Sequence, residues 1–288
     1  MLIHRVALRV SITMPISKSN KFTQLLPRYL HKAPRFVQVF AEQTVFDNPP
    51  HNKGSSALIV IYKSGLSRFM MQHIASHTHH SATVFLKETE IKSPSCSIRW
   101  FNQHNEIKRC GHGTLAAAVY LKKYQGNSPR KFYSLTGEIF KIQTSINNLQ
   151  LEITAINSEK IAPVHAIEMA IKAPILQSYS TTSKHGYTTV LINTEHPLKE
   201  LNVRVKELTD YPNAVIVLQQ NPHNGCFSFR YFAPYYGIAE DQATGSALSV
   251  LAPLIKQLNT EYKGVLFQAS VNGAVINYQL KKQSVRLY

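Results

Sequence analysis

Short apolar segments dominate the pattern of hydrophobic and polar residues along this chain. Several alternate apolar and polar residues with a period of two, which is typical of strands with one buried face, and others are continuous apolar runs of strand length. The pattern predicts strands at 36–40, 57–62, 83–86, 97–101, 132–135, 139–142, 149–154, 187–193, 214–218, 226–232, 266–269, 274–280 and 285–288. The fifth and sixth of these form a predicted hairpin around Thr136-Gly137.

Helical spacing of apolar residues occurs in fewer places. It predicts helices at 67–77 with Ser67 as N-cap, at 111–124, at 164–171 and at 247–254, and a weak amphipathic segment at 198–205. The second and fourth helices follow glycine and are rich in small apolar residues, so we expect them to be buried. Many short strands with one such helix in each half predict sheets wrapped around a central helix, twice over.

Composition narrows the class of protein. The chain has 288 residues with 44% hydrophobic residues, which is enough for a globular fold of one large or two small domains. Its three cysteines do not form a disulfide framework, which favours a reducing, cytoplasmic setting. No apolar run reaches the roughly 18 residues that a membrane span requires. The formal charge of +16 is spread along the chain, which favours a solvated basic surface over nucleic-acid binding.

Residues 1–35 differ from the rest of the chain. They contain seven Lys or Arg and no Asp or Glu, with Ser and Thr between them. This composition is similar to that of an organelle transit peptide. A disordered extension, or a start codon placed too far upstream, is equally compatible with it.

The stretch 230–249, RYFAPYYGIAEDQATGSALS, holds the candidate chemistry. An aromatic strand leads into the adjacent acids Glu240 and Asp241, and Thr244-Gly245-Ser246 then precede the apolar helix. Small residues at a helix start leave backbone N–H groups free to bind a carboxylate or phosphate. Acids beside such a site are candidates for proton transfer. An N-cap on a core helix is the alternative interpretation.

The first half of the chain contains a similar unit. There Arg99-Trp100-Phe101 is followed by Glu106 and by Gly111-His112-Gly113-Thr114, as Arg230-Tyr231-Phe232 is followed by Glu240 and by the second glycine-started helix. Two such units predict a pseudo-twofold molecule. A cleft between its lobes would lie between two helix N-termini and would suit a small anion.

These two stretches, IRWFNQHNEIKRCGHGTLAAA at 98–118 and FRYFAPYYGIAEDQATGSA at 229–247, resemble the PhzF-like family of phenazine biosynthesis. The resemblance implies an α+β, diaminopimelate-epimerase-like fold with two pseudo-symmetric lobes, each a curled, mostly antiparallel sheet around a central helix. We expect the N-terminal lobe at 36–148 and the C-terminal lobe at 149–288, with the last strand returning to the N-terminal lobe as an option. The resemblance also implies a homodimer, no metal or organic cofactor, and proton-shift isomerisation of a small carboxylate.

The resemblance assigns roles to particular residues. His112, Asp241 and Ser246 are the expected catalytic residues, and the backbone around them is expected to bind substrate. The expected substrate-binding residues are Gly111, Gly113, Thr244 and Gly245. The alternative for His112 is a capping or core histidine.

One position departs from the family pattern in a way that matters for catalysis. The family's acid/base glutamate in Ser-Glu-Thr-x-Phe corresponds to Ala82 in Ser81-Ala82-Thr83-Val84-Phe85. A positioned acid or base contributes about two to four orders of magnitude in rate, so the usual reaction should be severely impaired. If the strand continued, Glu88 and Glu90 would share the face of Ala82, but about 20–27 Å away.

Other positions limit the alternatives. The related racemases use one thiol in each half; Cys110 occupies the first position, but the second half offers Gln242 and Ala243. We therefore expect Cys110 to be a small buried residue, unless His112 stabilises its thiolate. His77, His79 and His80 lack a nearby carboxylate or cysteine in sequence, which disfavours a metal site.

The sequence therefore predicts a cytoplasmic PhzF-like isomerase in a biosynthetic process, or an organelle-targeted one if residues 1–35 act as a transit peptide. A catalytically inactive member that retains ligand binding or dimer interaction is the alternative.

Overall fold

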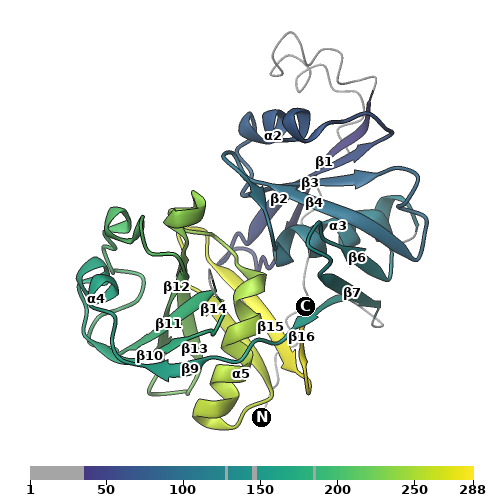
Figure 1. Ribbon diagram of the computed structural model, residues 1–288. Helices are drawn as coiled ribbons and strands as arrows, with labels where there is room; N and C mark the ends of the chain where they lie inside the picture. Colours follow the sequence, from purple (N-terminus) through teal and green to yellow (C-terminus); the bar gives the residue numbers. More distant parts are fainter. Residues whose placement is uncertain (1–35, 127–128, 145–147, 184–185) are drawn as a thin grey trace.

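The computed structural model describes residues 36–126, 129–144, 148–183 and 186–288, and Figure 1 shows two lobes. The predicted transit peptide or extension at 1–35 lies outside the described residues. Among the described residues, no helix is long and apolar enough to cross a membrane.

The first half of the chain forms strands around one long helix. Its elements are β1 (Val37–Val45), β2 (Ser55–Tyr62), α2 (Arg68–Ser76), β3 (Ala82–Lys87), β4 (Ser95–Phe101), β5 (Glu106–Ile107), α3 (Gly111–Tyr124), β6 (Lys131–Tyr133), β7 (Ile139–Thr144) and β8 (Leu149–Thr154). The predicted N-cap of α2 is confirmed, because the Ser67 hydroxyl accepts a hydrogen bond of 3.3 Å from the backbone N–H of Met70.

The second half repeats the arrangement around a second helix. Its elements are β9 (Glu159–Ile161), α4 (His165–Ile171), β10 (Ile175–Ser180), β11 (Tyr187–Ile192), η2 (Val205–Leu208), β12 (Ala214–Gln220), β13 (Phe227–Phe232), η3 (Pro234–Tyr236), η4 (Gly245–Ala247), α5 (Leu248–Asn259), β14 (Lys263–Gln268), β15 (Ala274–Leu280) and β16 (Ser284–Leu287).

The strands pair along one continuous path through both lobes. The order is β1-β2-β3-β4-β6-β7-β8-β16-β15-β14-β13-β12-β11-β10-β9, with β5 beside β4. Most pairs are antiparallel, and the parallel pairs are β2–β3, β4–β6, β11–β12 and β13–β14. The α+β, mostly antiparallel architecture predicted from the sequence is therefore confirmed.

The two lobes join where β8 pairs with β16, with Ile153 opposite Val285. β8 also pairs with β7 and contacts α3, so it continues the sheet of the first lobe. β16 contacts α5 of the second lobe and still pairs with β8. The last strand thus reaches the first lobe's sheet, whereas the boundary at 148/149 stays a prediction. A second connection is made by the loop after β1, whose Lys53 and Gly54 N–H groups donate to the carbonyls of Asn272 and Gly273.

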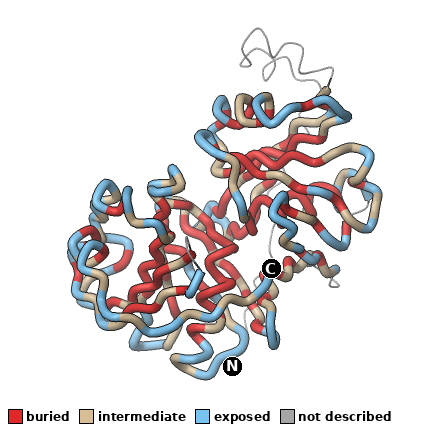
Figure 2. The backbone as a smooth tube through the Cα atoms, viewed as in Figure 1, coloured by how far each residue is buried: buried red, intermediate tan, exposed pale blue. Residues whose placement is uncertain are grey.

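Each sheet curls around its central helix. α3 is buried along most of its length and contacts β1, β2, β3 and β8, because its alanines allow close approach of the strands. α5 contacts β15 and β16 in the same way. The shorter helices α2 and α4 lie on the outer sides of the two lobes (Figure 1), and the buried backbone in Figure 2 follows the sheets and central helices.

The structure differs from the sequence-based expectations in the second lobe. β9 and β10 were not predicted; no residue of β9 is buried, and the two buried residues of β10, Ser178 and Tyr179, are adjacent rather than alternating. The amphipathic segment 198–205 has no regular structure before η2; its apolar residues instead pack onto the cluster beneath α4. The helix predicted at 247–254 begins two residues earlier, as the 3₁₀ turn η4, and continues as α5 to Asn259 through Pro253.

Candidate active site at the junction of the lobes

An arginine–glutamate pair stands beside the site in each lobe. Arg99 donates to both carboxylate oxygens of Glu106 at 2.7 and 2.9 Å, and Arg230 donates to both of Glu240 at 2.8 Å. Each guanidinium also lies over the Phe two residues further along its strand, 5.3 and 5.0 Å from the ring centroid. The similarity of the two segments in sequence is therefore also a similarity in structure. Since Glu106 and Glu240 are used in ion pairs, Asp241 is the remaining candidate acid of these two segments.

The two helix starts meet directly at the junction. A Cβ added to Gly111 would lie only 2.9 Å from the backbone nitrogen of Ser246 and 3.2 Å from the carbonyl carbon of Gly245. Only glycine fits the first turn of α3 at this distance. The positive ends of α3 and of η4–α5 thus converge on one place, which favours an anion there.

His112 occupies the first turn of α3 and is buried, with 4% of its surface exposed. Its Nε2 lies 3.1 Å from the Ser81 hydroxyl, and Ser81 in turn lies 2.8 Å from the Ser55 hydroxyl. Burial lowers the pKa of His112, and the nearby carboxylate of Asp241 only partly opposes this shift. The imidazole is therefore neutral near pH 7 and has one nitrogen able to accept a proton.

Asp241 is held at the start of the second helix. Its Oδ2 accepts a 2.9 Å hydrogen bond from the Thr244 hydroxyl, and its backbone N–H donates to the carbonyl of Tyr231. The buried amide of Gln268 donates to the carbonyl of Asp241 and accepts from the N–H of Thr244. This network orients the carboxylate within the same buried junction as the imidazole of His112.

The predicted site residues fall into two groups. His112, Asp241, Ser246, Gly111, Gly245 and Thr244 come together at the junction. Gly113 instead faces the core, because a Cβ there would lie 3.0 Å from the Cys110 sulfur and 3.1 Å from Trp100 and Val84. Its assigned role in substrate binding stays a prediction that only its backbone N–H could fulfil.

Ala82, the position of the family's glutamate, lies in the core of the first lobe. Ala82 begins β3, pairs with Ala57 and is fully buried in the core. The idea that Glu88 and Glu90 share its strand face is wrong, because β3 ends at Lys87; Glu90 instead accepts a hydrogen bond from the N–H of Ser97. No carboxylate from this strand reaches the site.

Cys110 is the N-cap residue of α3, and its sulfur lies 3.6 Å from Nδ1 of His112. Burial raises the pKa of its thiol well above the usual value, and the charge of Asp241 adds to this, so the thiol is protonated. Cys110 is buried as expected, and its low reactivity stays a prediction. The matching residue in the second lobe is Thr244, the N-cap of η4, rather than the expected Gln242 or Ala243.

Sequence reasoning missed two residues of this site. Ser81 stands immediately before Ala82, and its hydroxyl contacts the imidazole of His112. Gln268 ends the strand KGVLFQ, and a polar residue directly after an apolar run was the available signal in the sequence. In the structure its amide is buried. Among the described residues, no three His, Cys, Asp or Glu side chains are placed to hold a metal ion.

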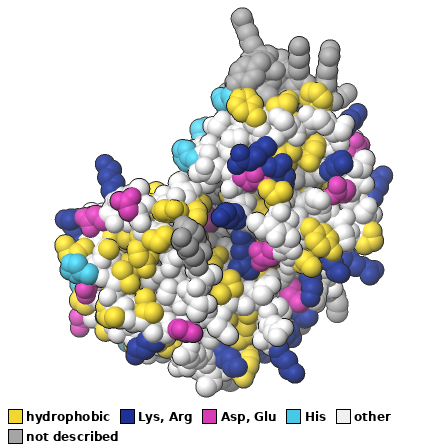
Figure 3. All heavy atoms as spheres, in the orientation of Figure 1, with side chains coloured by type: hydrophobic (Ala, Val, Ile, Leu, Met, Phe, Trp, Pro, Cys, Tyr) yellow, Lys and Arg dark blue, Asp and Glu magenta, His cyan; other side chains and the backbone are white. Residues whose placement is uncertain are grey.

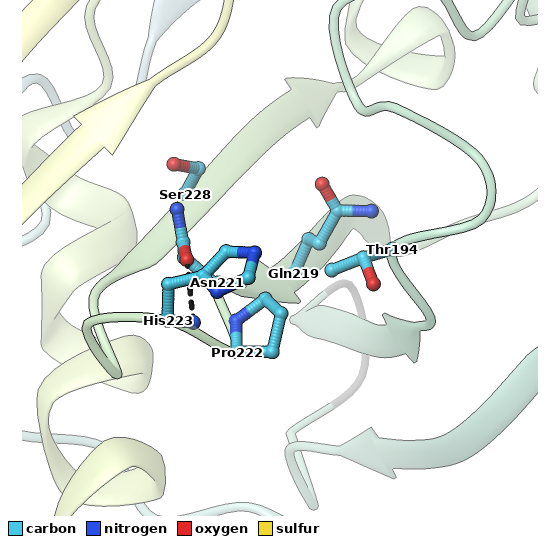
Figure 4. A pocket seen from close by; sticks show the side chains of 6 residues that line it. All are labelled: Thr194, Gln219, Asn221, Pro222, His223 and Ser228. Atoms are coloured by element: carbon cyan, nitrogen blue, oxygen red, sulfur yellow. Dashed lines mark hydrogen bonds between the residues drawn. The ribbon is translucent and has the colours of Figure 1, made fainter.

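A surface depression lies elsewhere, on the second lobe. It is lined by Thr194, Gln219, Asn221, Pro222, His223 and Ser228 (Figure 4). Its walls are the ends of β12 and β13, the turn between them and Thr194 in the loop after β11, with a hydrogen bond from the N–H of His223 to the Asn221 side chain. None of the predicted site residues lines it. In Figure 3, Lys and Arg side chains lie over both lobes and also in the recess between them.

The two lobes of mostly antiparallel strands define a diaminopimelate-epimerase-like fold. The fold matches a PhzF-family protein from Enterococcus faecalis with a TM-score of 0.73 at 23% identity, covering 88% of this chain and 93% of that one. It also matches a hydroxyproline epimerase from Agrobacterium vitis with a TM-score of 0.52 at 9% identity, over 88% and 89% of the two chains.

Residues 37–285 match the family model for phenazine biosynthesis-like proteins, and the chain belongs to this family. An uncharacterized isomerase of Halalkalibacterium halodurans is 28% identical over 240 residues, or 82% of this chain and 88% of that protein. The phenazine biosynthesis-like domain-containing protein 1 of Mus musculus is 29% identical over 276 residues, or 87% and 92% of the two chains.

Proposed function

We propose that this protein binds a small carboxylate between the two helix starts and isomerises it by a proton shift without a cofactor. The observation that carries the proposal is the shared burial of His112 and Asp241 at the point where both helix N-termini converge. A neutral imidazole and a carboxylate at one water-poor site form an acid/base pair. Membership of a family that includes isomerases supports the same reaction class.

In the proposed reaction, the substrate carboxylate accepts hydrogen bonds from the first-turn N–H groups of Gly111, Gly245 and Ser246. One member of the acid/base pair removes a proton from a carbon near the carboxylate, and a proton is returned to a different carbon. The double bond moves, and no oxidant or reductant is consumed. Because Ala82 supplies no carboxyl group, we expect turnover about two to four orders of magnitude below that of an enzyme with a positioned glutamate there.

A binding protein without catalytic activity is the second candidate, and one observation favours it. The methyl group of Ala82 is fully buried, and the hydroxyls beside it, those of Ser81 and Ser55, bond to each other. A site of this kind can retain a ligand although the first lobe supplies no carboxyl group at the position of Ala82.

We also propose that the protein acts as a homodimer in the cytoplasm, within a biosynthetic process. The family resemblance supports the dimer, and the scarcity of cysteine supports a reducing compartment. Targeting to an organelle by residues 1–35 is the alternative. Light scattering on the purified chain, together with localisation of a tagged chain with and without residues 1–35, tests both statements.

Incorporation of solvent deuterium into a panel of small cyclic and acyclic carboxylates tests the catalytic proposal. The panel includes trans-4-hydroxy-L-proline, the molecule bound to the structurally similar Agrobacterium vitis epimerase. Wild type is compared with Asp241→Asn and Ala82→Glu, and the exposed Asp210→Asn serves as the matched control. We expect exchange by wild type that is lost in Asp241→Asn and retained in Asp210→Asn.

The remaining outcomes separate the two candidates. Exchange only in Ala82→Glu would show an inactive site with its architecture intact. Calorimetric binding of a panel member without exchange in any variant would support the binding protein and refute the isomerase.

A further inference from the structure

Arg109 lies directly before Cys110 and α3, and its side chain crosses from the first lobe to the second. Its Nη1 donates a 3.0 Å hydrogen bond to the hydroxyl of Ser249 in α5, and its Nη2 donates to the carbonyl of Thr154 at 3.2 Å. On the other side, Nη2 lies 2.8 Å from Glu138 in an ion pair. Only 14% of the Arg109 side chain is exposed, so these contacts are made largely out of water.

Ser249 links Arg109 to Ser246 at the second helix start. While its hydroxyl accepts from Arg109, it donates a 2.7 Å hydrogen bond to the carbonyl of Ser246. The backbone carbonyl of Ser249 accepts from the N–H of Ile156 at 2.8 Å. This carbonyl is available because its usual helical donor would be residue 253, which is proline and has no N–H. Ser249 is thereby fixed from two sides.

Two of the contacts between the lobes beside the helix starts matter here. One is the backbone contact of Gly111 with Ser246, and the other is the chain of hydrogen bonds from Arg109 through Ser249 to Ser246. The backbone contact alone limits how close the helix starts can come. The bond from Arg109 to Ser249 limits how far apart they can move, since it is lost when the lobes separate, whereas Glu138 and Thr154 hold the guanidinium from the side of the first lobe.

We propose that Arg109 is a positioning residue that holds the segment Thr244–Ser246 at a fixed separation from the start of α3. The positioning role itself does not depend on the proposed function. Only the purpose of the fixed separation, which is to bind a carboxylate between the helix starts, rests on it. The planar guanidinium suits this role because it reaches Ser249, Thr154 and Glu138 at once, which an ammonium cannot do in the same geometry.

Amide hydrogen exchange tests the proposal without any knowledge of the substrate. The amides to follow are those of Ala247 and Leu248, which bond to carbonyls of the η4 turn. We expect Arg109→Met to raise their exchange rates about tenfold, the effect of losing one to two hydrogen bonds, and Arg109→Lys to raise them less. Global stability is measured in parallel by urea unfolding.

Two controls distinguish positioning from general destabilisation. Glu138→Gln removes the outer ion pair but leaves the bond from Arg109 to Ser249. Arg286→Met removes a comparable arginine, paired with Glu152 at 3.0 Å on strands β16 and β8. Neither control should change exchange of the η4 amides by more than about twofold.

Ser249→Ala supplies a second route if Arg109→Met does not fold. It breaks the connection to Ser246 while Arg109 keeps its other partners, and it should raise exchange at the same amides. Unchanged exchange in Ser249→Ala, or an equal rise in both control variants, would overturn the proposal. If exchange responds as expected but calorimetry with trans-4-hydroxy-L-proline and the rest of the carboxylate panel shows no binding, the proposed function fails and the positioning role stands.

Discussion

Replacing Glu240 with glutamine should destabilise the protein far more than an ordinary surface ion pair would suggest. The Arg230 and Glu240 side chains are only 11% and 16% exposed and share two hydrogen bonds of 2.8 Å. Removing one partner of a buried pair costs about 3–5 kcal/mol, because the other charge is left without compensation. Arg230 retains the carbonyls of Leu198 and Leu201 as acceptors, so we expect the low end, about 3 kcal/mol.

The assay is the free energy of unfolding from urea titration, with the slope m checked for each variant. Glu207→Gln is the matched control, because Glu207 pairs with Arg204 at 3.0 Å but the two side chains are 37% and 51% exposed. Its loss should stay below about 1 kcal/mol. The double variant Arg230→Met/Glu240→Gln should lose less than the sum of its single variants, since no uncompensated charge remains. Equal losses in Glu240→Gln and Glu207→Gln, or strict additivity in the double variant, would refute the reasoning.

Three further predictions concern single side chains. Ser67→Ala should cost about 0.5–1 kcal/mol of unfolding free energy by removing the cap of α2, and an unchanged urea midpoint would contradict this. Burial raises the pKa of Glu106, but the bonds and charges of Arg99 and Arg68 outweigh it and the net pKa is lowered. The pair's stabilisation is therefore complete above the unfolded-state pKa of about 4.3 and lost as pH falls through the lower folded value, so wild type and Glu106→Gln should converge in stability in acid. In the native state iodoacetamide should label the half-exposed Cys226 well before Cys110, as read by peptide mass spectrometry; early labelling of Cys110 would show that its thiol is accessible.

The elements predicted best from the sequence are those whose own residues favour a single type of structure. α3 begins and ends where predicted, because glycine marks its start and the following alanines favour helix while allowing strands to pack close. β8 is equally clear, since its apolar residues alternate strictly. β10 was missed because its sequence, ILQSYS, follows a proline and places polar residues on both faces of the strand. Only Ser178 and Tyr179 within it are buried. Its pairing with β11 and β9 is a tertiary effect that no local pattern encodes.

The candidate site was predictable to a similar degree. The repeated Arg-aromatic-Phe and glycine signals predicted that His112 and Asp241 share one site, and the structure brings both to one junction, since each lies within a short segment anchored to a helix start; their roles stay a prediction. Contacts between distant segments were beyond the sequence. Ser81 meets His112 because the first lobe's sheet curls around α3, and Arg109 meets Ser249 because the two lobes lie against each other. The separation of the two helix starts depends on such contacts.

The pairing of β8 with β16 has a consequence for the order in which the molecule folds. Leu151 and Ile153 must wait for partners at Leu287 and Val285, which lie at the far end of the second lobe in sequence. Closing so long a loop is entropically costly and slow, whereas the hairpin of β7 and β8 is local. Each lobe can therefore gain its own helix and most of its strands early, with the junction forming last. Since His112, Asp241 and the guanidinium of Arg109 come together at that junction, the candidate site should be the last part of the protein to acquire its structure.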